Sequence, residues 1–410
     1  MMDDEFLKFA IQFFPIKNIT PNCLMKLLRN LLDNVRPHFS KGGRFEKLHY
    51  GFDALETFLF VPGATTTGTG VHIRDAMDLK RTMMTVIISL VPCLIFGMWN
   101  VGSQHYKAFG MEESLLQNTL FGFWKVLPMI IVSYAAGLGV EFIFSVLRHH
   151  PVSEGYLVTG LLIPLTLPVT TPLWMIAMGA IFCTLLGKEV FGGTGFNFMN
   201  PALLARAFLF FAFPAYLSGD IWTDLSPEAG RQIVDGYSGA TNLVTFDENF
   251  HQLPDAMTLF WGFEQGSVGE TSVLACLIGA LILILTGVGS GRIIVSVFLG
   301  AYIVGLFLNI MAPANMPNHS MATPAHLHWL VGGFAFGAVF MATDPVSAAQ
   351  TPTGKIIYGL LIGGGVVALR VFNPAYPEGM MLSILLMNVF APLIDHVVVE
   401  RHIQKRMKKS

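Results

Sequence analysis

Long blocks of apolar residues, separated by short polar segments, dominate the chain from residue 81 onward. A helix needs about 20 mostly apolar residues to cross the hydrocarbon core of a bilayer. The pattern therefore predicts ten membrane-spanning helices, of which the third and the eighth are short and interrupted by Pro or Gly. They lie near residues 82–101, 122–147, 156–169, 172–191, 201–218, 271–290, 293–313, 327–343, 356–371 and 379–398.

The composition agrees with an all-α, polytopic membrane protein. Of the 410 residues, 53% are hydrophobic and 13% are charged, against about 25% charged in soluble domains. The formal net charge of -2 gives no indication of a nucleic-acid partner. The first apolar stretch, residues 6–16, is short and carries Lys8, so a cleavable signal peptide is not expected.

The four cysteines predict neither a disulfide framework nor a metal site. They are scattered along the chain without a CxxC pair, and an iron–sulfur cluster held by this chain alone would need closer spacing. Three of them lie within apolar runs, where a small buried hydrophobic side chain is the ordinary role. The four are Cys23, Cys93, Cys183 and Cys276.

The distribution of charge predicts the orientation of the chain in the membrane. Basic residues gather in the non-spanning region 1–80 and in the tail 399–410. Ten spans place both ends on one side, which the positive-inside rule makes the cytoplasm. The loop 219–270 then faces outward, to the periplasm of a Gram-negative cell, and it carries nine acidic residues against Arg231 alone. In the amino-terminal region, residues 25–35 predict a short amphipathic helix that lies on the membrane or on a partner.

Two similar segments predict an internal repeat. Residues 161–168 contain two prolines and are followed by a span and then by Asn200-Pro-Ala; residues 340–345 are followed by a span and then by Asn373-Pro-Ala. Matching broken helices in two halves are typical of inverted repeats with a site at mid-depth. Because each half, 81–218 and 271–398, has five spans, the second half enters from the opposite side. Coincidence of the two short motifs is the alternative.

The most informative polar stretch is Asp235-Gly-Tyr-Ser-Gly-Ala-Thr241 in the outer loop. It resembles the acceptor motif of flavin transferases, which join the phosphate of FMN to a threonine hydroxyl. Gly236 and Gly239 allow the backbone to turn tightly, and Thr241 supplies the hydroxyl for a phosphoester. Within the motif, Asp235, Ser238, Gly239 and Ala240 accompany Thr241 as candidate cofactor-binding residues. An ordinary Ser/Thr/Gly turn is the alternative.

With these features together, the chain resembles the B-type subunit of the sodium-translocating NADH:quinone reductases along essentially its whole length. The resemblance rests on short stretches at both ends of the chain and in the loop. They are Pro37-His38, Lys41-Gly-Gly43, residues 53–59, residues 72–81, residues 192–202, residues 235–241 and residues 341–345. The sister family, the D-type subunit of the Rnf ferredoxin:NAD oxidoreductases, shares the spans and the flavin motif but lacks the long amino-terminal region.

The resemblance implies a place in a six-subunit respiratory pump of the bacterial inner membrane, with subunits A, C, D, E and F as partners. It implies FMN attached covalently to Thr241 by a flavin transferase, a non-covalent riboflavin, ubiquinone reduced on the cytoplasmic side, and Na⁺ moved outward. The implied fold has two inverted five-helix repeats, similar to urea transporters. The resemblance assigns no catalytic side chain. It also links a Gly-Gly pair with the quinone site: Gly137 matches, Leu138 departs from the pattern, and Gly139 follows.

Three acids lie within or at the edge of the predicted spans: Glu141, Asp344 and Asp395. A charge at mid-bilayer costs about 2.5–3.5 kcal/mol on insertion scales, so such residues usually face a polar pathway or a partner. Oxygen ligands suit Na⁺, and Asp344 precedes Pro345, where a broken helix frees carbonyl groups. We therefore expect the ion path at these acids, Asp344 first. An interfacial or intersubunit ion pair is the alternative for each.

Three functions fit the sequence. The first is the redox-driven sodium pump subunit. The second is a channel or secondary transporter of the urea-transporter type with no redox role, and the third is an Rnf-type subunit with another electron partner. A threonine in a flavin-acceptor motif favours the first and third, and the first 80 residues favour the first.

Overall fold

The computed structural model describes a helical protein and divides into two compact units. The described residues are 21–39, 43, 45, 49, 52, 56, 79–111, 113–148, 152, 155–226, 233–234, 237–243, 253–312, 320–373 and 378–408. Their regular elements are all helical. The smaller unit comprises residues 1–80 and 141–153, and the larger one residues 81–140 and 154–410.

The smaller unit contains α2 (Pro21–Phe39), which covers the predicted amphipathic helix. Its last turn is held to the segment that follows. Arg36 forms an ion pair with Glu56, and the ring of Phe39 stacks on Phe45 at 5.6 Å and on Phe52 at 4.9 Å. Most of the predicted amino-terminal motif residues, including 53–55, 57–59 and 72–78, lie outside the described residues.

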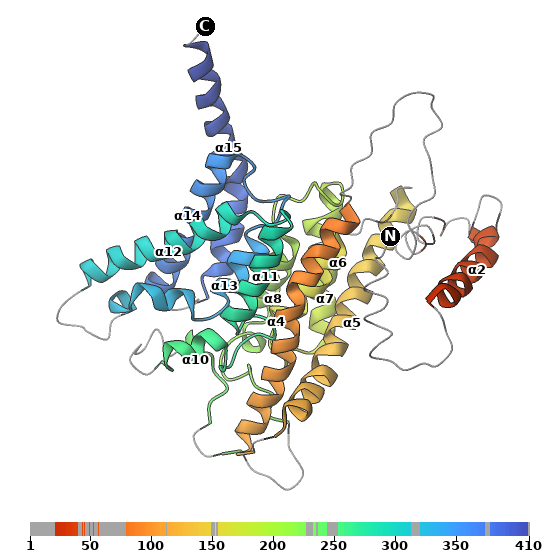
Figure 1. Cartoon of the computed structure of the whole chain (residues 1–410), viewed down its shortest axis with the longest axis horizontal. Helices are drawn as coiled ribbons and strands as arrows, with labels where there is room; N and C mark the ends of the chain where they lie inside the picture. Colours follow the sequence, from red (N-terminus) through yellow and green to blue (C-terminus); the bar gives the residue numbers. More distant parts are fainter. Residues whose placement is uncertain are drawn as a thin grey trace. The chain divides into compact units, whose positions relative to one another are not determined.

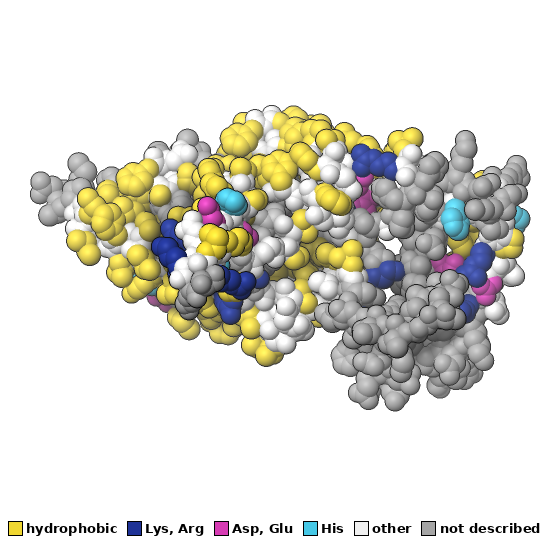
Figure 2. Space-filling view, turned by 90° about the horizontal axis from the view of Figure 1, so that it is seen from above, with side chains coloured by type: hydrophobic (Ala, Val, Ile, Leu, Met, Phe, Trp, Pro, Cys, Tyr) yellow, Lys and Arg dark blue, Asp and Glu magenta, His cyan; other side chains and the backbone are white. Residues whose placement is uncertain are grey.

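Within the described residues, six helices are long and apolar enough to cross a membrane, and they confirm a multi-pass α-helical membrane protein. Large apolar side chains on them face outward, such as Ile95 of α4 and Ile310 of α12, and Figure 2 shows hydrophobic side chains over much of the visible surface. The six are α4 (Leu79–Ala108), α5 (Leu115–Arg148), α7 (Leu173–Gly187) with η2 (Glu189–Phe191), α12 (Gly291–Met311), α14 (Pro352–Phe372) and α15 (Met380–Met407).

The other four predicted spans coincide with shorter helices. They are α6 (Tyr156–Leu165), α8 (Pro201–Ala212), α11 (Val273–Leu285), and a broken pair formed by α13 (Phe334–Phe336) and the π-helical turn η7 (Gly337–Met341). The prediction for 201–218 was too long, because Pro214 lacks an amide hydrogen and restricts Phe213. The chain there continues as the short turn η3 (Pro214–Tyr216). As predicted, the segment 327–343 is broken at a glycine: Gly332 has a φ of 65°, and α13 begins two residues later.

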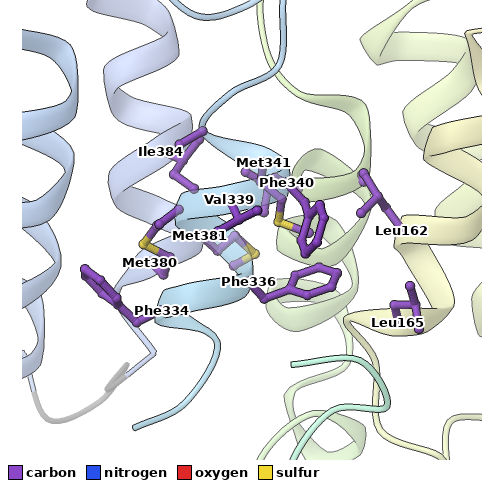
Figure 3. Packing of buried hydrophobic residues seen from close by; sticks show 14 of the residues in the cluster. Leu162, Leu165, Phe334, Phe336, Val339, Phe340, Met341, Met380, Met381 and Ile384 are labelled. Atoms are coloured by element: carbon purple, nitrogen blue, oxygen red, sulfur yellow. The ribbon is translucent and has the colours of Figure 1, made fainter. Parts of the chain in front are cut away.

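The broken pair α13–η7 lies in the middle of the larger unit. Figure 3 shows Phe334 to Met341 between Leu162 and Leu165 of α6 on one side and Met380, Met381 and Ile384 of α15 on the other. Every residue of α13 and η7 is buried, as expected for a helix that is apolar all round. Helices α12 and α14 lie along each other (Figure 1). Glycines allow this close approach, because a β-carbon at Gly300 or Gly363 would fall about 2 Å from a backbone oxygen of the other helix.

The two broken helices end at opposite ends of the larger unit. At the end of α6, the amides of Val268 and Gly269 donate to the carbonyls of Leu167 and Leu165, just before α11 begins. At the end of η7, residues 343–346 instead share a cavity with the start of α6 and the segment after α11. We refer below to the first end, which also carries α10 (Ala256–Trp261), as the loop end, and to the second as the Asp344 end.

Candidate functional site

The segment that carries Thr241 is held against the loop end of the larger unit by several hydrogen bonds. The hydroxyl of Ser238 donates to Asp220 at 2.7 Å and accepts from the amide of Ala240 at 3.2 Å. Gly239 approaches the backbone so closely that a β-carbon would lie 2.6 Å from the carbonyl oxygen of Asp220. A residue with a β-carbon would therefore clash at position 239, which explains the glycine. Asp235 and Gly236, the upstream part of the predicted motif, lie outside the described residues.

Hydrogen bonds from residues before and after Thr241 also connect this segment to α4, directly or through Glu264. Asn242 donates from its side chain to the carboxyl group of Glu264, and Asn100 of α4 donates to the backbone carbonyl of Glu264 at 2.8 Å. Tyr237 donates to the carbonyl of Gln104 at 3.3 Å. Thr241 itself is half-buried, and within the described part of the chain its hydroxyl forms no hydrogen bond.

Thr241 borders a small cavity, of about 20 Å³, whose walls carry three glutamates. Glu264 is 4% exposed and Glu270 is 6% exposed, and Glu378 lies at the same cavity. Burial raises the pKa of Glu264 to about 8, against the lowering effect of the Asn242 hydrogen bond and of the Arg370 charge. Burial likewise raises the pKa of Glu270, although Arg206 opposes it.

Arg206 of α8 connects two of these glutamates. Its guanidinium lies 2.6 Å from Glu270 and also forms an ion pair with Glu378, and the hydroxyl of Ser267 donates to the other oxygen of Glu270. A second buried arginine, Arg370 of α14, donates at 2.7 Å to each of two backbone carbonyls, those of His328 and Val331. The carbonyl of His328 belongs to η6 (Ala325–Trp329), and that of Val331 to the stretch between η6 and α13, where the helix is broken.

Asp344 lies at the opposite end of the unit, beside a cavity of about 80 Å³. Its carboxylate accepts from the hydroxyl of Ser347 at 2.5 Å and from the amide of Val346 at 3.5 Å. The wall of the cavity is mostly apolar, with polar side chains from several elements. Besides Asp344, they are Thr82, Thr159, Lys188, Thr194, Asn197, Asn200 and Thr343.

Asn200 has a structural role in the same wall. Its side-chain oxygen accepts from the amides of Ala202 and Leu203 and caps the first turn of α8. Its amide donates to the carbonyl of Met341 at 3.4 Å, where η7 ends. Asn373, its predicted counterpart, instead ends α14, and Pro374 and Ala375 lie outside the described residues.

Asp395 holds the segment that directly precedes α14. It accepts from the amides of Gln350 at 2.6 Å and Thr351 at 3.0 Å and from the Thr351 hydroxyl. The side chain of Gln350 also donates to the carbonyl of Pro345 at 2.7 Å. Asp344 and Asp395 are therefore connected through one short segment, and Asp395 fixes the residues just before α14, whose own cap is Thr351.

The remaining predicted residues lie on α5. Glu141 belongs to the smaller unit and is 2% exposed. Gly137 packs on the ring of Tyr156, where a β-carbon would lie 1.8 Å from Cζ, whereas Gly139 faces open space. The structure thus gives the two glycines different surroundings.

Sequence reasoning missed Arg206, Arg370 and the roles of Glu264 and Glu270. The sequence presents the two glutamates only as charges of an outer loop. The available signal was an arginine inside each of two apolar helices, because an ionisable residue within a membrane segment usually has a partner.

Comparison with known proteins gives a consistent result. Residues 66–404 match the sequence model of the NQR2, RnfD, RnfE family. The chain is 45% identical over 412 residues to the B-type subunit of the Na(+)-translocating NADH-quinone reductase of Pseudomonas aeruginosa (strain LESB58), covering 93% of this chain and 99% of that one. It is 43% identical to the corresponding subunit of Chromohalobacter salexigens, over 93% and 97% of the two chains. It is also 44% identical to the corresponding subunit of Azotobacter vinelandii, over 94% of this chain and 100% of that one.

Proposed function

Because the chain belongs to the NQR2, RnfD, RnfE family, we propose that it is the B-type membrane subunit of a Na⁺-translocating NADH:ubiquinone reductase. The alignment with the Pseudomonas relative leaves 7% of the chain uncovered, about 29 of 410 residues. This is fewer than the 65 residues that precede the family match, so the relatives share part of the amino-terminal region. That shared region favours the quinone reductase over an Rnf-type subunit.

The proposed topology is ten crossings in two inverted five-helix repeats, as in urea transporters, with both termini in the cytoplasm. Two observations support it. All ten predicted segments contain helices, and the two broken helices end at opposite ends of the larger unit. The loop end would then face the periplasm of a bacterial inner membrane, and the Asp344 end the cytoplasm. Basic residues at the exposed end of α15, such as Lys405 and Arg406, agree with this orientation.

Thr241 is the proposed attachment site of FMN. The residues fit the group: the hydroxyl is half-buried at the edge of a cavity and is not engaged in a hydrogen bond by any described residue. Ser238, Gly239 and Ala240 fix the turn before it. A flavin transferase would form the phosphoester, and FMN there would supply one-electron and two-electron transfer on the outer side of the membrane.

The cavity beside Asp344 is the proposed site of the non-covalent riboflavin. Apolar walls with a few converging hydroxyl and amide groups are typical of cofactor pockets, and Thr159, Asn197 and Asn200 supply such groups here. A volume of about 80 Å³ admits one edge of a flavin ring, so binding requires side chains at the cavity to move. Thr159→Val should lower the amount of extractable flavin per complex, and an unchanged amount would argue against this site.

Asp344 is the proposed first ligand of the Na⁺ path, with Asp395 and Glu141 as further members. Moving one Na⁺ against about 100 mV requires roughly 2.3 kcal/mol. A two-electron drop of about 30 mV supplies roughly 1.4 kcal/mol, so about 50 mV per ion suffices. Asp344→Ala should weaken the Na⁺ dependence of quinone reduction and leave the covalent flavin on Thr241 unchanged, whereas Glu400→Gln on the exposed end of α15 should change neither. Unaltered Na⁺ kinetics in Asp344→Ala would count against the assignment.

The quinone region is proposed on α5 at Gly137 and Gly139. The open space at Gly139 suits a flat ring that packs on a helix surface. Gly139→Leu should raise the KM for ubiquinone with little change in flavin content, and an unchanged KM would exclude contact at this position. The partner subunits A, C, D, E and F would deliver the electrons.

The observation that carries the function is Thr241 in its fixed turn at the loop end. The test is ultraviolet fluorescence of the subunit on a denaturing gel, from cells that contain the flavin transferase. Wild type should fluoresce, Thr241→Leu should be dark, and Thr170→Leu, an exposed threonine at the same end, should match wild type. A dark wild-type band, with the transferase active on another substrate, would favour a channel or secondary transporter without a redox role.

A further inference from the structure

Glu264 is a buried acidic side chain that is joined directly to the Thr241 segment. Its carboxyl group accepts a hydrogen bond from Asn242, the residue that follows Thr241. Its backbone carbonyl accepts from Asn100 of α4 at 2.8 Å. Glu264 and Thr241 also border the same cavity. A change at Glu264 is therefore passed to Thr241 through one hydrogen bond and one peptide unit.

No described cation forms an ion pair with Glu264. Arg206 of α8 is engaged by Glu270 and Glu378. Arg370 of α14 is the other nearby cation, and its two terminal nitrogens donate to the carbonyls of His328 and Val331. The carboxyl group of Glu264 is thus bonded to a neutral amide and is 4% exposed. An ionised carboxylate in such surroundings is strongly disfavoured.

We propose that Glu264 is a positioning residue that holds the Thr241 segment as a neutral carboxylic acid and exchanges its proton with solvent in response to the charge carried at Thr241. The proposal rests on the attachment of FMN to Thr241. The exchange is an acid–base step only: the carboxylate binds one proton from water outside the membrane and forms an O–H bond, and no electron moves to or from Glu264. Negative charge added at Thr241 favours the protonated form, because like charges raise the pKa of a carboxyl group.

By reciprocity, ionisation of Glu264 opposes the addition of an electron at Thr241. The raised pKa of about 8 places this ionisation just above neutral pH. The other groups that face the cavity are Glu270, Glu378 and, through these two, Arg206. They already form an ion pair cluster, and Arg370 acts on Glu264 by its charge. Burial raises the pKa of Glu270 to about 7, so this group titrates at the lower edge of the range. We expect the component near pH 8 to come from Glu264, and Glu264→Gln separates the two because it removes only that component.

The experiment is a redox titration of the intact complex, followed by the visible absorbance of the covalent flavin, at several pH values between about 6.5 and 9.5. In wild type, the midpoint potential should contain a component that falls as the pH rises through about 8. Glu264→Gln should lack this component, because glutamine keeps an acceptor for Asn242 but has no proton to release. Asp255→Asn, at an exposed carboxylate of the same end whose capping role at α10 asparagine can keep, should behave like wild type. The same pH dependence in wild type and Glu264→Gln would overturn the proposal.

A second measurement keeps the two proposals apart. The infrared difference spectrum between pH 7 and pH 9 should contain a carboxylic-acid band that disappears at high pH and is missing in Glu264→Gln. This band does not require a flavin. A wild-type subunit with the band but without gel fluorescence would defeat the FMN attachment, whereas a fluorescent subunit without the band would defeat the role of Glu264.

Discussion

Removal of Arg206 tests whether the buried charge cluster at the loop end stabilises the fold. Arg206 contacts Glu270 at 2.6 Å and forms a second ion pair with Glu378, and the arginine and Glu270 side chains are each 7% exposed. Arg206→Met keeps the length and the apolar stem of the side chain. It removes the positive charge and leaves the carboxyl groups of Glu270 and Glu378 without this counterion.

The expected magnitude follows from the burial. An exposed ion pair contributes about 0–1 kcal/mol, whereas removing one partner of a buried pair costs about 3–5 kcal/mol, because the remaining charge has no counterion. The pKa of Glu270 is already raised by burial to about 7, so without Arg206 this carboxyl group will take up a proton at neutral pH. Protonation relieves part of the penalty, and we expect a loss near the lower limit, about 3 kcal/mol, at pH 7.

The assay is the fraction of monodisperse protein that remains after heating, measured by size exclusion for each variant at pH 7. Lys125→Met is the matched control, because the Lys125–Asp224 pair has the same 2.6 Å separation but the lysine is 40% exposed. Arg206→Met should melt well below Lys125→Met. Addition of Glu270→Gln to Arg206→Met should recover part of the loss. Equal melting of the two single variants would refute the reasoning that burial decides the magnitude.

Three further predictions concern other buried groups. The pKa of Glu264 is about 8 in the folded protein and 4.5 in the reference state, so the stability of the fold decreases as the pH rises through 8. Between pH 7 and 9, wild type should lose about 1.4 kcal/mol of stability relative to Glu264→Gln. Melting temperatures of the two proteins that change in parallel with pH would contradict this. Asn200→Ala should cost about 1–2 kcal/mol by removing the cap of α8 and should speed hydrogen exchange in its first turn; Asn200→Ser should retain most of the protection. The thiols of Cys93 and Cys276 lie 3.8 Å apart, so a membrane-permeant oxidant should protect both from alkylation, as read by mass spectrometry, while Cys183 remains reactive after denaturation.

The sequence was sufficient for the helices because their signals are local. The predicted span 356–371 lies within α14, and the Thr351-Pro352 pair at its start is an ordinary helix-initiation signal: Thr351 accepts from the amide of Gly354 at 3.0 Å. Proline and glycine also predicted which segments would be broken. Local signals could not show that α13 and η7 pack between α6 and α15. A segment that is apolar on all sides has no polar face, so its sequence does not indicate which neighbours it contacts.

The charge cluster could not be predicted for a related reason. Arg206 is separated from Glu270 by 64 residues and from Glu378 by 172, and no local pattern specifies such a pair. In sequence, Glu264 and Glu270 belong to an acidic loop, and acidic loops are usually solvated. Here the loop folds back onto the helices, because Asn100 and Arg206 provide partners that make its burial possible.

The two ends of the broken pair α13–η7 satisfy their free backbone groups in different ways, and the difference bears on where a cation can bind. At the loop end, the carbonyls of His328 and Val331 are occupied by the guanidinium of Arg370. A fixed positive charge on these oxygens opposes a second cation there. At the Asp344 end, the carbonyl of Met341 receives a neutral amide from Asn200, and the carboxylate of Asp344 receives a neutral hydroxyl and a backbone amide. Oxygen atoms of this kind suit Na⁺, although Lys188 lies in the wall of the same cavity. If Na⁺ binds at Asp344 as proposed, Asp344→Ala should alter the Na⁺ dependence of quinone reduction and a variant of the Arg206 cluster should not.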